Sequence, residues 1–340
     1  MHDEIQASAA GNAGTTKPPT TPGAGSLPPA QDCHKRPLRR IGVVGLGRMG
    51  QVLALTLLSN GYQVVAYDRD PQRMASLYGE GARVAGRLGD LATCDAVLSS
   101  LPNDEALASV ALGPEGLVGV MMPGSLHLST STVSPALSRK LEKAHRARGQ
   151  GFAAAAIVGN PDLARARRIF VLASGAEDAL TRARPLLESL GQRLFALGED
   201  AGAANVMKLA CNVLTAATLQ SMGEVMALLR KCGMDPQQTF EVLTGTLFDG
   251  RVHKAYGSKI VAERYSPAGM ATPLAVKDLR LALAEAEGRA VPMPVASVVH
   301  DRLVALVARG WADLDWSALG ALAASDAGLG ETAADPAASA

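Results

Sequence analysis

The chain has 340 residues, 48% of them hydrophobic, which is enough for two domains of ordinary size with a sizeable core. Its 33 basic and 32 acidic residues nearly balance, and this argues against a protein that binds nucleic acid through phosphate contacts. No apolar run reaches about 18 residues without a charged or amide side chain, so no membrane span is expected.

The cysteines are few and scattered, and no two of them form a C-x-x-C pair; they are Cys33, Cys94, Cys211 and Cys232. This pattern argues against a zinc site and against a disulfide framework. It is typical of a protein in a reducing cytosol, so we expect a cytoplasmic location and no metal.

Both ends of the chain are expected to be disordered tails. Residues 1–37 are rich in Ala, Gly, Pro and Thr and show no period, and residues 326–340 are mostly Ala with Asp, Glu and Gly. Neither stretch buries enough apolar surface to offset its ordering entropy. The first tail carries Asp3 and Glu4 and has no apolar h-region, so it is not a secretory signal; a transit peptide stays open.

Short apolar runs alternate with helical patterns between Leu38 and about Leu197. In chain order the runs are IGVVG (41–45), QVVAY (63–67), AVLSSL (96–101), LHLS (126–129), FAAAAIV (152–158) and IFVLAS (169–174). Such alternation predicts an α/β domain with a doubly wound parallel sheet over residues 38–198. Strand signals then disappear, and residues 199–325 are expected to form an all-helical domain of five or six helices, the first over about 202–230.

A glycine-rich motif lies between the first strand and the first helix. Its residues are Gly45, Leu46, Gly47, Arg48, Met49 and Gly50, which spell G-x-G-x-x-G. The first glycine permits a tight turn, the second lets the backbone approach a pyrophosphate, and the third lets helix and strand pack closely. The helix start offers free N–H groups to phosphate. The motif therefore predicts a Rossmann-type dinucleotide site, although a glycine-rich turn in an unrelated α/β protein is the alternative.

The end of the second strand bears on which dinucleotide binds. Asp68 follows Gly50 by 18 residues, where a carboxylate can bind the adenosine ribose hydroxyls. Asp68 and Asp70 would repel a 2′-phosphate, whereas Arg69 could pair with one. We expect NAD or NADP as cofactor, with NAD favoured.

The helix expected over about 202–230 is apolar nearly all round but contains a polar stripe. At 100° per residue, Asn205, Lys208 and Asn212 fall within about 60° of one another. Burial lowers the pKa of a lysine, and such a lysine can exchange a proton with an alcohol or alkoxide during hydride transfer. The alternative is a lysine whose stem packs while its head reaches water. Because the helix begins where the α/β domain ends, we expect it to line the interdomain cleft, which favours the catalytic interpretation.

The motifs together resemble those of the 3-hydroxyisobutyrate dehydrogenase, or β-hydroxyacid dehydrogenase, family over roughly residues 38–323. The matching stretches, in the family's order, are GLGRMG (45–50), Leu101–Pro102, STVSP (131–135), GAANVMKLACN (202–212) and Lys277–Asp278–Leu279.

The resemblance implies a role for each matching residue. Lys208 would be the catalytic acid/base, and Asn212 and Ser131 would contact the substrate. The cofactor would be lined by Leu101, Pro102 and Thr132, and Lys277 would reach it from the helical domain. Two alternatives stay open: Ser131 and Thr132 could cap the helix that starts at Pro135, and Lys277 could be an ordinary surface residue.

One stretch departs from the family's pattern. The family's substrate loop reads close to DAPVSGG, whereas this chain has AAAIVGN over residues 154–160, so only Gly159 and Asn160 could still present polar groups. Arg165, Arg167 and Arg168 follow, and a solvated helix face is the favoured account of them. The related imine reductases also have an apolar loop here, with a Gly-x-Pro similar to GNP (159–161), but they usually carry Asp or Tyr in place of Lys208.

The sequence thus predicts an NAD(P)-dependent oxidoreductase that acts on a small carbonyl or alcohol. The alternatives are an imine reductase or reductive aminase, and a dinucleotide-binding scaffold without catalysis. The many apolar helix faces also predict a homodimer built mainly from the helical domain.

Overall fold

The computed structural model describes residues 37–330, so most of both predicted tails lies outside the described residues. The C-terminal tail was expected from residue 326. Asp326 instead ends helix α14 (Leu319–Asp326), and its carboxylate pairs with Arg302 and, at 3.2 Å, with Arg309. The two arginines attach the end of this helix to the preceding one.

The first half of the chain folds around one sheet, in which the described strands follow the order β3–β2–β1–β4–β5–β6–β7–β8. In chain order they are β1 (Arg40–Val44), β2 (Gln63–Tyr67), β3 (Arg83–Val84), β4 (Ala96–Ser99), β5 (Leu126–Ser129), β6 (Gly151–Val158), β7 (Phe170–Gly175) and β8 (Arg193–Ala196). The predicted doubly wound α/β fold is confirmed. The sequence missed β3 and β8, which are short edge strands with little buried apolar pattern.

One strand pair departs from the parallel arrangement that the sequence predicts. β7 runs antiparallel to β6, with Ala154 opposite Ser174 and Val158 opposite Phe170. A parallel crossover needs a connection of about a dozen residues or more, usually a full helix. The connection here holds only the five-residue helix α7 (Pro161–Arg165), so the chain turns back along its neighbour.

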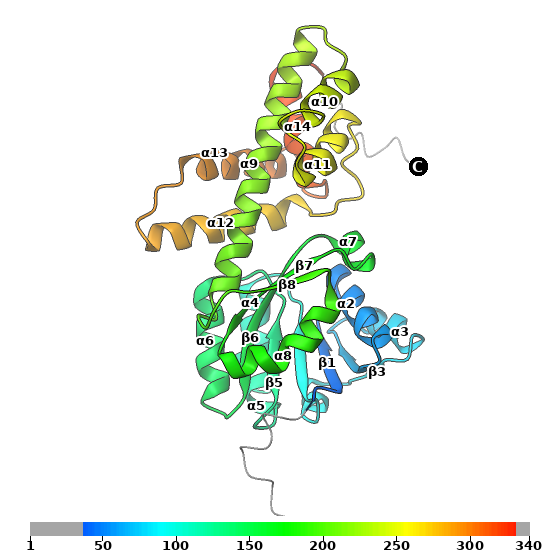
Figure 1. Ribbon diagram of the computed structural model, residues 1–340, viewed down its shortest axis with the longest axis vertical. Coiled ribbons are helices and arrows are strands. Elements are labelled where there is room, and N and C mark those ends of the chain that lie inside the picture. Colours follow the sequence, from blue (N-terminus) through cyan, green and yellow to red (C-terminus); the bar gives the residue numbers. More distant parts are fainter. Residues whose placement is uncertain (1–36, 331–340) are drawn as a thin grey trace, which may run out of the picture.

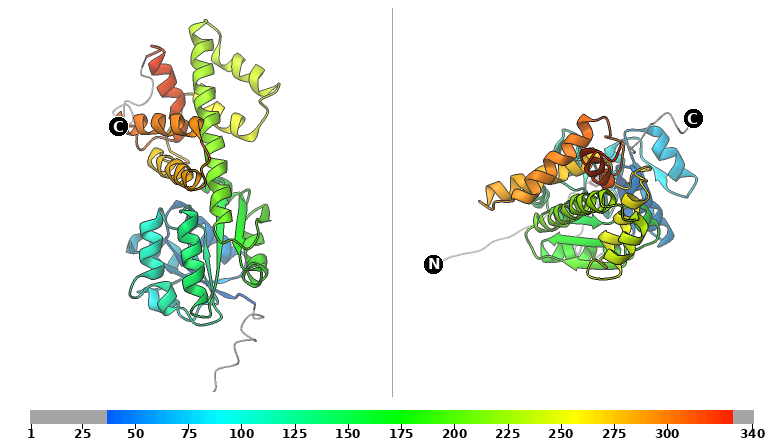
Figure 2. Two further views of the ribbon diagram at one scale, coloured as in Figure 1. Left: turned by 90° about the vertical axis from the view of Figure 1, so that its left-hand side faces the viewer. Right: turned by 90° about the horizontal axis from the view of Figure 1, so that it is seen from above.

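Helices cover both faces of the sheet (Figures 1 and 2). One face packs against α2 (Arg48–Ser59), α3 (Pro71–Tyr78), α7 and α8 (Glu177–Leu190). The other packs against η1 (Leu88–Leu91), α4 (Asp104–Leu112), α5 (Leu117–Val120), α6 (Pro135–Arg146) and the first turns of α9 (Ala203–Lys231). The loops after β4 and β5 face the helical half of the molecule, because Lys277 of that half contacts Pro102 and Thr132.

The second half is built on α9, which runs from the sheet domain to the far end of the molecule (Figure 1). Around it lie α10 (Pro236–Thr244), α11 (Arg251–Val261), α12 (Thr272–Gly288), α13 (Pro294–Ala308), η2 (Trp316–Ala318) and α14. Their core includes Leu219, Leu279, Leu303 and Leu319, all fully buried. Within residues 37–330, no helix combines the length and the apolar character that crossing a bilayer requires.

Buried polar side chains form a row of hydrogen bonds beneath the carboxyl end of β4. Gln150 Nε2 donates to the Met121 carbonyl oxygen (2.6 Å), so Gln150 Oε1 accepts from His145 Nδ1 (2.7 Å). A neutral His145 then accepts at Nε2 from His127 Nδ1 (2.8 Å), and a neutral His127 accepts at Nε2 from the Ser99 hydroxyl (2.9 Å). The row ties β4 and β5 to α6 directly below the loops that would hold a cofactor.

Because of these two buried histidines, we expect the free energy of unfolding to fall in acid. Burial lowers the pKa of His127 well below its ordinary 6.5 and that of His145 to about 4. The unfolded chain therefore takes up protons first, so stability is full above about pH 6.5 and is lost as the pH falls towards 4. We expect His145 alone to lower the free energy of unfolding by about 3 kcal/mol across that window.

Urea unfolding at a series of pH values measures this loss. His145→Gln cannot take up the proton, so its free energy of unfolding should fall less steeply between pH 6.5 and 4. Equal slopes in the two proteins would show that His145 is not the titrating group.

Candidate active site

The glycine-rich loop between β1 and α2 has the shape that a dinucleotide needs. Gly45 has φ +86°, and a Cβ there would lie 2.4 Å from the Ser100 carbonyl oxygen. A Cβ on Gly50 would lie 1.9 Å from the Gly45 carbonyl oxygen, so strand and helix meet at contact distance. A Cβ on Gly47, by contrast, would meet no atom within 4 Å. Only this central glycine faces open space, where a pyrophosphate would approach the backbone.

The start of α2 adds electrostatic attraction for that pyrophosphate. Its N-cap is Gly47, no side chain caps it, and its first turn holds no acidic residue. No carboxylate of the helix's own first turn therefore competes for its N-terminal N–H groups. Arg48 begins the helix and donates a hydrogen bond to the Ala268 carbonyl oxygen of the helical domain, which places a loop of that domain beside the site.

Asp68, at the end of β2, is buried against the glycine-rich loop. Its Oδ2 accepts from Leu46 N (2.6 Å) and its Oδ1 accepts from Asp70 N (2.9 Å). Arg73 Nη1 lies 3.8 Å from Asp68 Oδ2. The neighbouring Arg69 has an exposed side chain. The carboxylate thus fixes the glycine-rich loop to the end of β2.

The ends of β4 and β5 are joined through the residues that the sequence assigned to the cofactor and substrate. Ser131 Oγ accepts from Leu101 N (2.8 Å). Lys277, from α12, donates to the carbonyl oxygens of Pro102 (3.1 Å) and Thr132 (2.5 Å). The N-cap of α6 is Ser134, so the interpretation of Ser131 and Thr132 as helix caps was wrong. Lys277 is 14% exposed and bridges the two domains, so it is not an ordinary surface residue.

The lysine in the apolar helix is buried together with its head group. Lys208 is 8% exposed, and its Nζ donates to Asn212 Oδ1 (3.0 Å). Asn212 Nδ2 in turn donates to Asp278 Oδ2 (2.5 Å), and Asp278 Oδ1 pairs with Lys277 Nζ (2.9 Å). The four side chains form one series that runs from α9 to the cofactor edge of the sheet. The alternative, in which the Lys208 ammonium group reaches water, does not agree with this burial.

Burial lowers the pKa of Lys208 below its ordinary value of 10.5, and the nearby Asp278 carboxylate opposes that shift. Such a lysine holds a proton less firmly than a solvated one, which suits a group that both gives and takes a proton. Asn205, the third residue of the polar stripe on α9, does not join this series. Asn205 accepts from Val133 N (3.3 Å) and donates to Ser138 Oγ (2.8 Å), so it fixes α9 onto the sheet domain.

Asp278 is the residue of this group that the sequence did not assign to the site. The sequence does contain a signal for it, because Asp278 has helical spacing to the apolar residues Ala275, Leu279 and Ala282. In α12 these residues form the buried face. A carboxylate on a buried helix face needs a partner, which here is Asn212 on one side and Lys277 on the other.

The stretch that departs from the family's pattern is mostly strand. Residues 154–158 belong to β6, and Ala154, Ala155 and Ala156 are fully buried. Gly159 follows with φ +144°, and Asn160 caps α7 by accepting from Leu163 N (2.9 Å). The residues that would offer a serine to a carboxylate are thus apolar core.

The arginines that follow are engaged at the surface. Arg165 pairs with Asp162 (2.7 Å), and Arg167 donates to Asn60 Oδ1 (2.9 Å) and Ser59 Oγ (2.7 Å). Both lie with exposed side chains on the α2 side of the sheet. These contacts agree with the solvated face that was favoured for them.

Two family models match the chain in succession. The one described as the NAD binding domain of 6-phosphogluconate dehydrogenase matches residues 40–198, and the one described as NAD-binding of NADP-dependent 3-hydroxyisobutyrate dehydrogenase matches residues 202–323. The oxidoreductase YfjR of Bacillus subtilis is 34% identical over 82% of this chain and 98% of its own length. The 3-hydroxyisobutyrate dehydrogenase of Pseudomonas aeruginosa is 31% identical over 77% of this chain and 90% of its own.

Solved structures agree with these matches. The 3-hydroxyisobutyrate dehydrogenase of Salmonella typhimurium superposes with a TM-score of 0.75 at 27% identity, over 84% of this chain and 99% of that one. An imine reductase of Myxococcus stipitatus shares the fold, with a TM-score of 0.57 at 23% identity over 83% of this chain and 98% of its own. With the dinucleotide loop, the buried lysine and both matched halves in place, the chain belongs to the 3-hydroxyisobutyrate (β-hydroxyacid) dehydrogenase family of NAD(P)-dependent oxidoreductases.

Proposed function

We propose that Lys208 is the acid/base in hydride transfer between the nicotinamide and a small carbonyl or alcohol. The observation that carries this proposal is the buried series Lys208–Asn212–Asp278–Lys277, which ends on the loops after β4 and β5. The bound cofactor supplies or takes up the hydride. Lys208 would donate a proton to the developing alkoxide in reduction and accept one from the alcohol in oxidation.

The neighbouring residues would hold the reactants around that lysine. Asn212 orients the amine through its Oδ1 and offers its amide to a substrate oxygen, and Ser131 would contact the substrate at the end of β5. The glycine-rich loop would hold the pyrophosphate, and Leu101, Pro102, Thr132 and Lys277 would line the nicotinamide half of the cofactor.

Asp68 supports NAD rather than NADP as the preferred cofactor. Its carboxylate lies beside the glycine-rich loop, where it would accept from ribose hydroxyls and repel a 2′-phosphate. Arg69, by contrast, is exposed and forms no ion pair among the described residues, so it could bind the 2′-phosphate of NADP. The ratio of kcat/KM for the two cofactors measures this preference.

The substrate is proposed to be a short hydroxy acid or the corresponding semialdehyde. The names of several relatives contain such compounds, among them 3-hydroxyisobutyrate and L-threonate. The apolar end of β6 supports a second candidate, a cyclic imine, because that stretch offers no serine to a carboxylate. Turnover of hydroxy acids, semialdehydes and imines with both cofactors separates the two. Imine reduction without carbonyl or alcohol turnover would replace the first proposal, and cofactor binding without turnover of any class would favour a scaffold.

Asp278 gives a pH test of the proposed site. Its negative charge raises the pKa of Lys208, so Asp278→Asn should lower that pKa further. Alcohol oxidation needs the neutral amine, so its rate–pH curve should move to lower pH, by about one unit. The new amide keeps an acceptor oxygen for Asn212. A curve that stays in place or moves to higher pH would contradict the proposed coupling.

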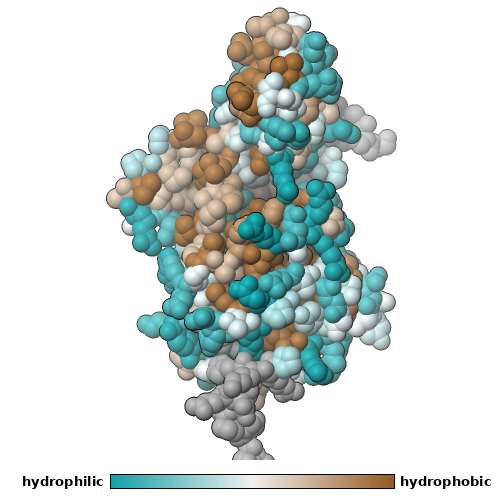
Figure 3. Space-filling model, viewed as in Figure 1, coloured by the Kyte–Doolittle hydropathy of each residue, from teal (hydrophilic) through white to brown (hydrophobic). Residues whose placement is uncertain are grey.

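The homodimer is proposed to form along an exposed seam of α9. Of the 18 exposed large hydrophobic side chains among the described residues, 15 lie at or beyond Val206, and Figure 3 shows such side chains over the helical part. Four of them on α9, Met207, Leu214, Val225 and Leu228, fall on positions with the four-three spacing of a coiled coil. The remaining positions of this seam are Cys211, Thr218 and Ser221. No residue of the seam is charged, so two copies would meet without repulsion.

Replacing Leu214 by glutamate tests this seam. Leu214 is 71% exposed, and a charge there should abolish the dimer mass in light scattering at micromolar concentration. At 100° per residue, Leu214 lies about 120° around α9 from Lys208 and nearly two turns of the helix away, so turnover should persist. Tyr78→Glu is the matched control, because Tyr78 is 72% exposed but lies on the sheet domain. A monomeric wild type, or an unchanged mass in Leu214→Glu, would contradict the proposed interface.

Two further proposals concern the chain as a whole. We place the boundary between the two domains at residues 198–199, in the connection between β8 and α9. We also propose a cytoplasmic location, which is supported by free thiols at the described cysteines Cys94, Cys211 and Cys232.

A further inference from the structure

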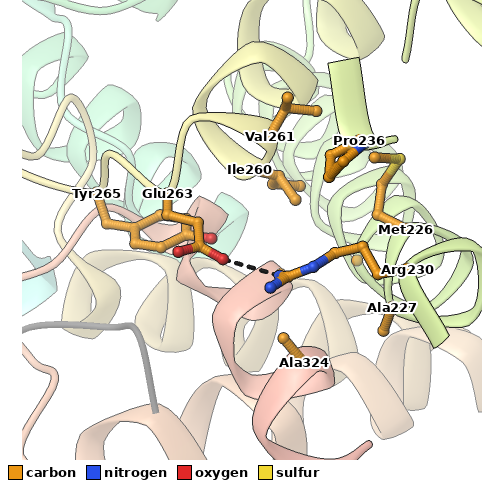
Figure 4. A pocket seen from close by; sticks show the side chains of 11 residues that line it. Met226, Ala227, Arg230, Pro236, Ile260, Val261, Glu263, Tyr265 and Ala324 are labelled. Atoms are coloured by element: carbon orange, nitrogen blue, oxygen red, sulfur yellow. Dashed lines mark hydrogen bonds and ion pairs between the residues drawn. The ribbon is translucent and has the colours of Figure 1, made fainter. Parts of the chain in front are cut away.

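A second cavity lies in the helical domain, far from Lys208. It has a volume of about 240 Å³ and opens between the later half of α9, the start of α10, the end of α11 and α14 (Figure 4). Met226 lies 18 residues beyond Lys208 on the same helix, which is about 27 Å along its axis. None of the lining residues belongs to the proposed active site.

The cavity arises from the way in which α9 and α14 cross. A Cβ on Gly223 would lie 2.8 Å from the Cα of Gly320, so the two backbones are in contact at this point. Beside this contact, the small side chains of Ala227 and Ala324 line the cavity and fill little of its space. Met226, Ile260 and Val261 give it apolar walls, and Tyr265 lines it beside Glu263 (Figure 4).

The mouth of the cavity carries one ion pair. Arg230 Nη1 donates to Glu263 Oε1 at 2.8 Å, and Figure 4 shows both side chains extending towards each other across the opening. Both are about a quarter exposed, at 26% and 29%. This bond uses one of five guanidinium donors and one of two carboxylate oxygens, so each group retains capacity for a ligand.

We propose that this cavity binds a free α-amino acid with an apolar side chain. The ligand's carboxylate would accept from Arg230, its ammonium group would donate to Glu263, and its side chain would enter the space between Met226, Ile260 and Ala324. A zwitterion suits the site because the mouth is itself neutral, whereas a lone anion would face the Glu263 carboxylate. A cavity of about 150 Å³ already holds benzene, so 240 Å³ accommodates a branched aliphatic side chain.

The site does not depend on the proposed dimer seam. At 100° per residue, Gly223, Met226, Ala227 and Arg230 centre on the side of α9 opposite to Leu214 and Val225. Dimerisation along the seam would therefore leave the cavity accessible.

Calorimetric titration of the full chain, saturated with its cofactor, tests the proposal with three probes. L-Leucine carries both charges, 4-methylpentanoate lacks the ammonium group, and 3-methylbutylamine lacks the carboxylate. We expect leucine to bind at least tenfold more tightly than either analogue, because each analogue loses a charge-assisted hydrogen bond. Equal binding of leucine and 4-methylpentanoate, or no leucine binding at millimolar concentration, would overturn the proposal.

Variants locate the binding. Arg230→Gln and Glu263→Gln should each weaken leucine binding at least tenfold, while Lys208→Ala should leave it unchanged. Both glutamine variants alter side chains that are only about a quarter exposed, and an unchanged melting temperature shows that they fold. Loss of leucine binding in Lys208→Ala with retention in Arg230→Gln would place the ligand in the active site and overturn the proposal.

Discussion

Replacing Lys208 by alanine is expected to lower turnover by about 10²- to 10⁴-fold, which is the usual contribution of a general acid or base. That range equals roughly 3–5 kcal/mol of activation free energy. Cofactor affinity should survive, because the glycine-rich loop and Asp68 are formed within the sheet domain, whereas Lys208 Nζ hydrogen-bonds to Asn212. Steady-state kinetics and cofactor titration by fluorescence give the two readouts.

A matched control lies on the same helix. Lys231 ends α9 and is exposed, so Lys231→Ala should retain full turnover. Full activity in Lys208→Ala would remove Lys208 from the chemistry. Equal loss of turnover and of cofactor affinity would point instead to a collapsed cleft.

Replacing Gly47 by valine is expected to weaken cofactor binding roughly ten- to hundredfold. Gly47 has φ −63°, which any residue adopts, and a Cβ there meets no protein atom within 4 Å. The fold should therefore accept the side chain, but the space would no longer admit a pyrophosphate. Loss of one or more hydrogen bonds to a charged group accounts for the expected size, at about 1.5–3 kcal/mol.

Gly79 provides the control for this substitution. It also has φ −63° and no atom within 4 Å of its Cβ position, but it lies at the end of α3. Gly79→Val should leave cofactor affinity and melting temperature unchanged. If Gly47→Val kept the wild-type affinity as well, the cofactor would not lie over this loop.

Much of the fold follows from local sequence signals. The strands around the glycine motif are continuous apolar runs, and Gly45, Gly47 and Gly50 have the three separate environments that their spacing predicts. The long helix was expected over 202–230 and is Ala203–Lys231, because its apolar character continues without a proline until Gly233, and its one internal glycine, Gly223, packs against α14. These features depend on neighbours in the chain, which a single sequence displays.

Features that depend on distant contacts were less predictable. The antiparallel turn from β6 to β7 depends on how a short connection packs. Most of the expected substrate loop is part of β6, in the core of the sheet. The buried row through His127 and His145 joins β5, α6 and the start of β6, and no periodicity reveals it. Asp278 was visible in the sequence, but its pairing with Asn212, 66 residues earlier, was not.

The central claim is that Lys208 moves the proton that accompanies hydride transfer, and the pH dependence of single-turnover alcohol oxidation tests it most directly. Nicotinamide absorbance reports the hydride step itself. The wild-type rate should rise with pH through one ionisation below the ordinary lysine value of 10.5, and that ionisation should be missing in Lys208→Ala. The same ionisation in both proteins would assign the proton to another group and contradict the proposed role of Lys208.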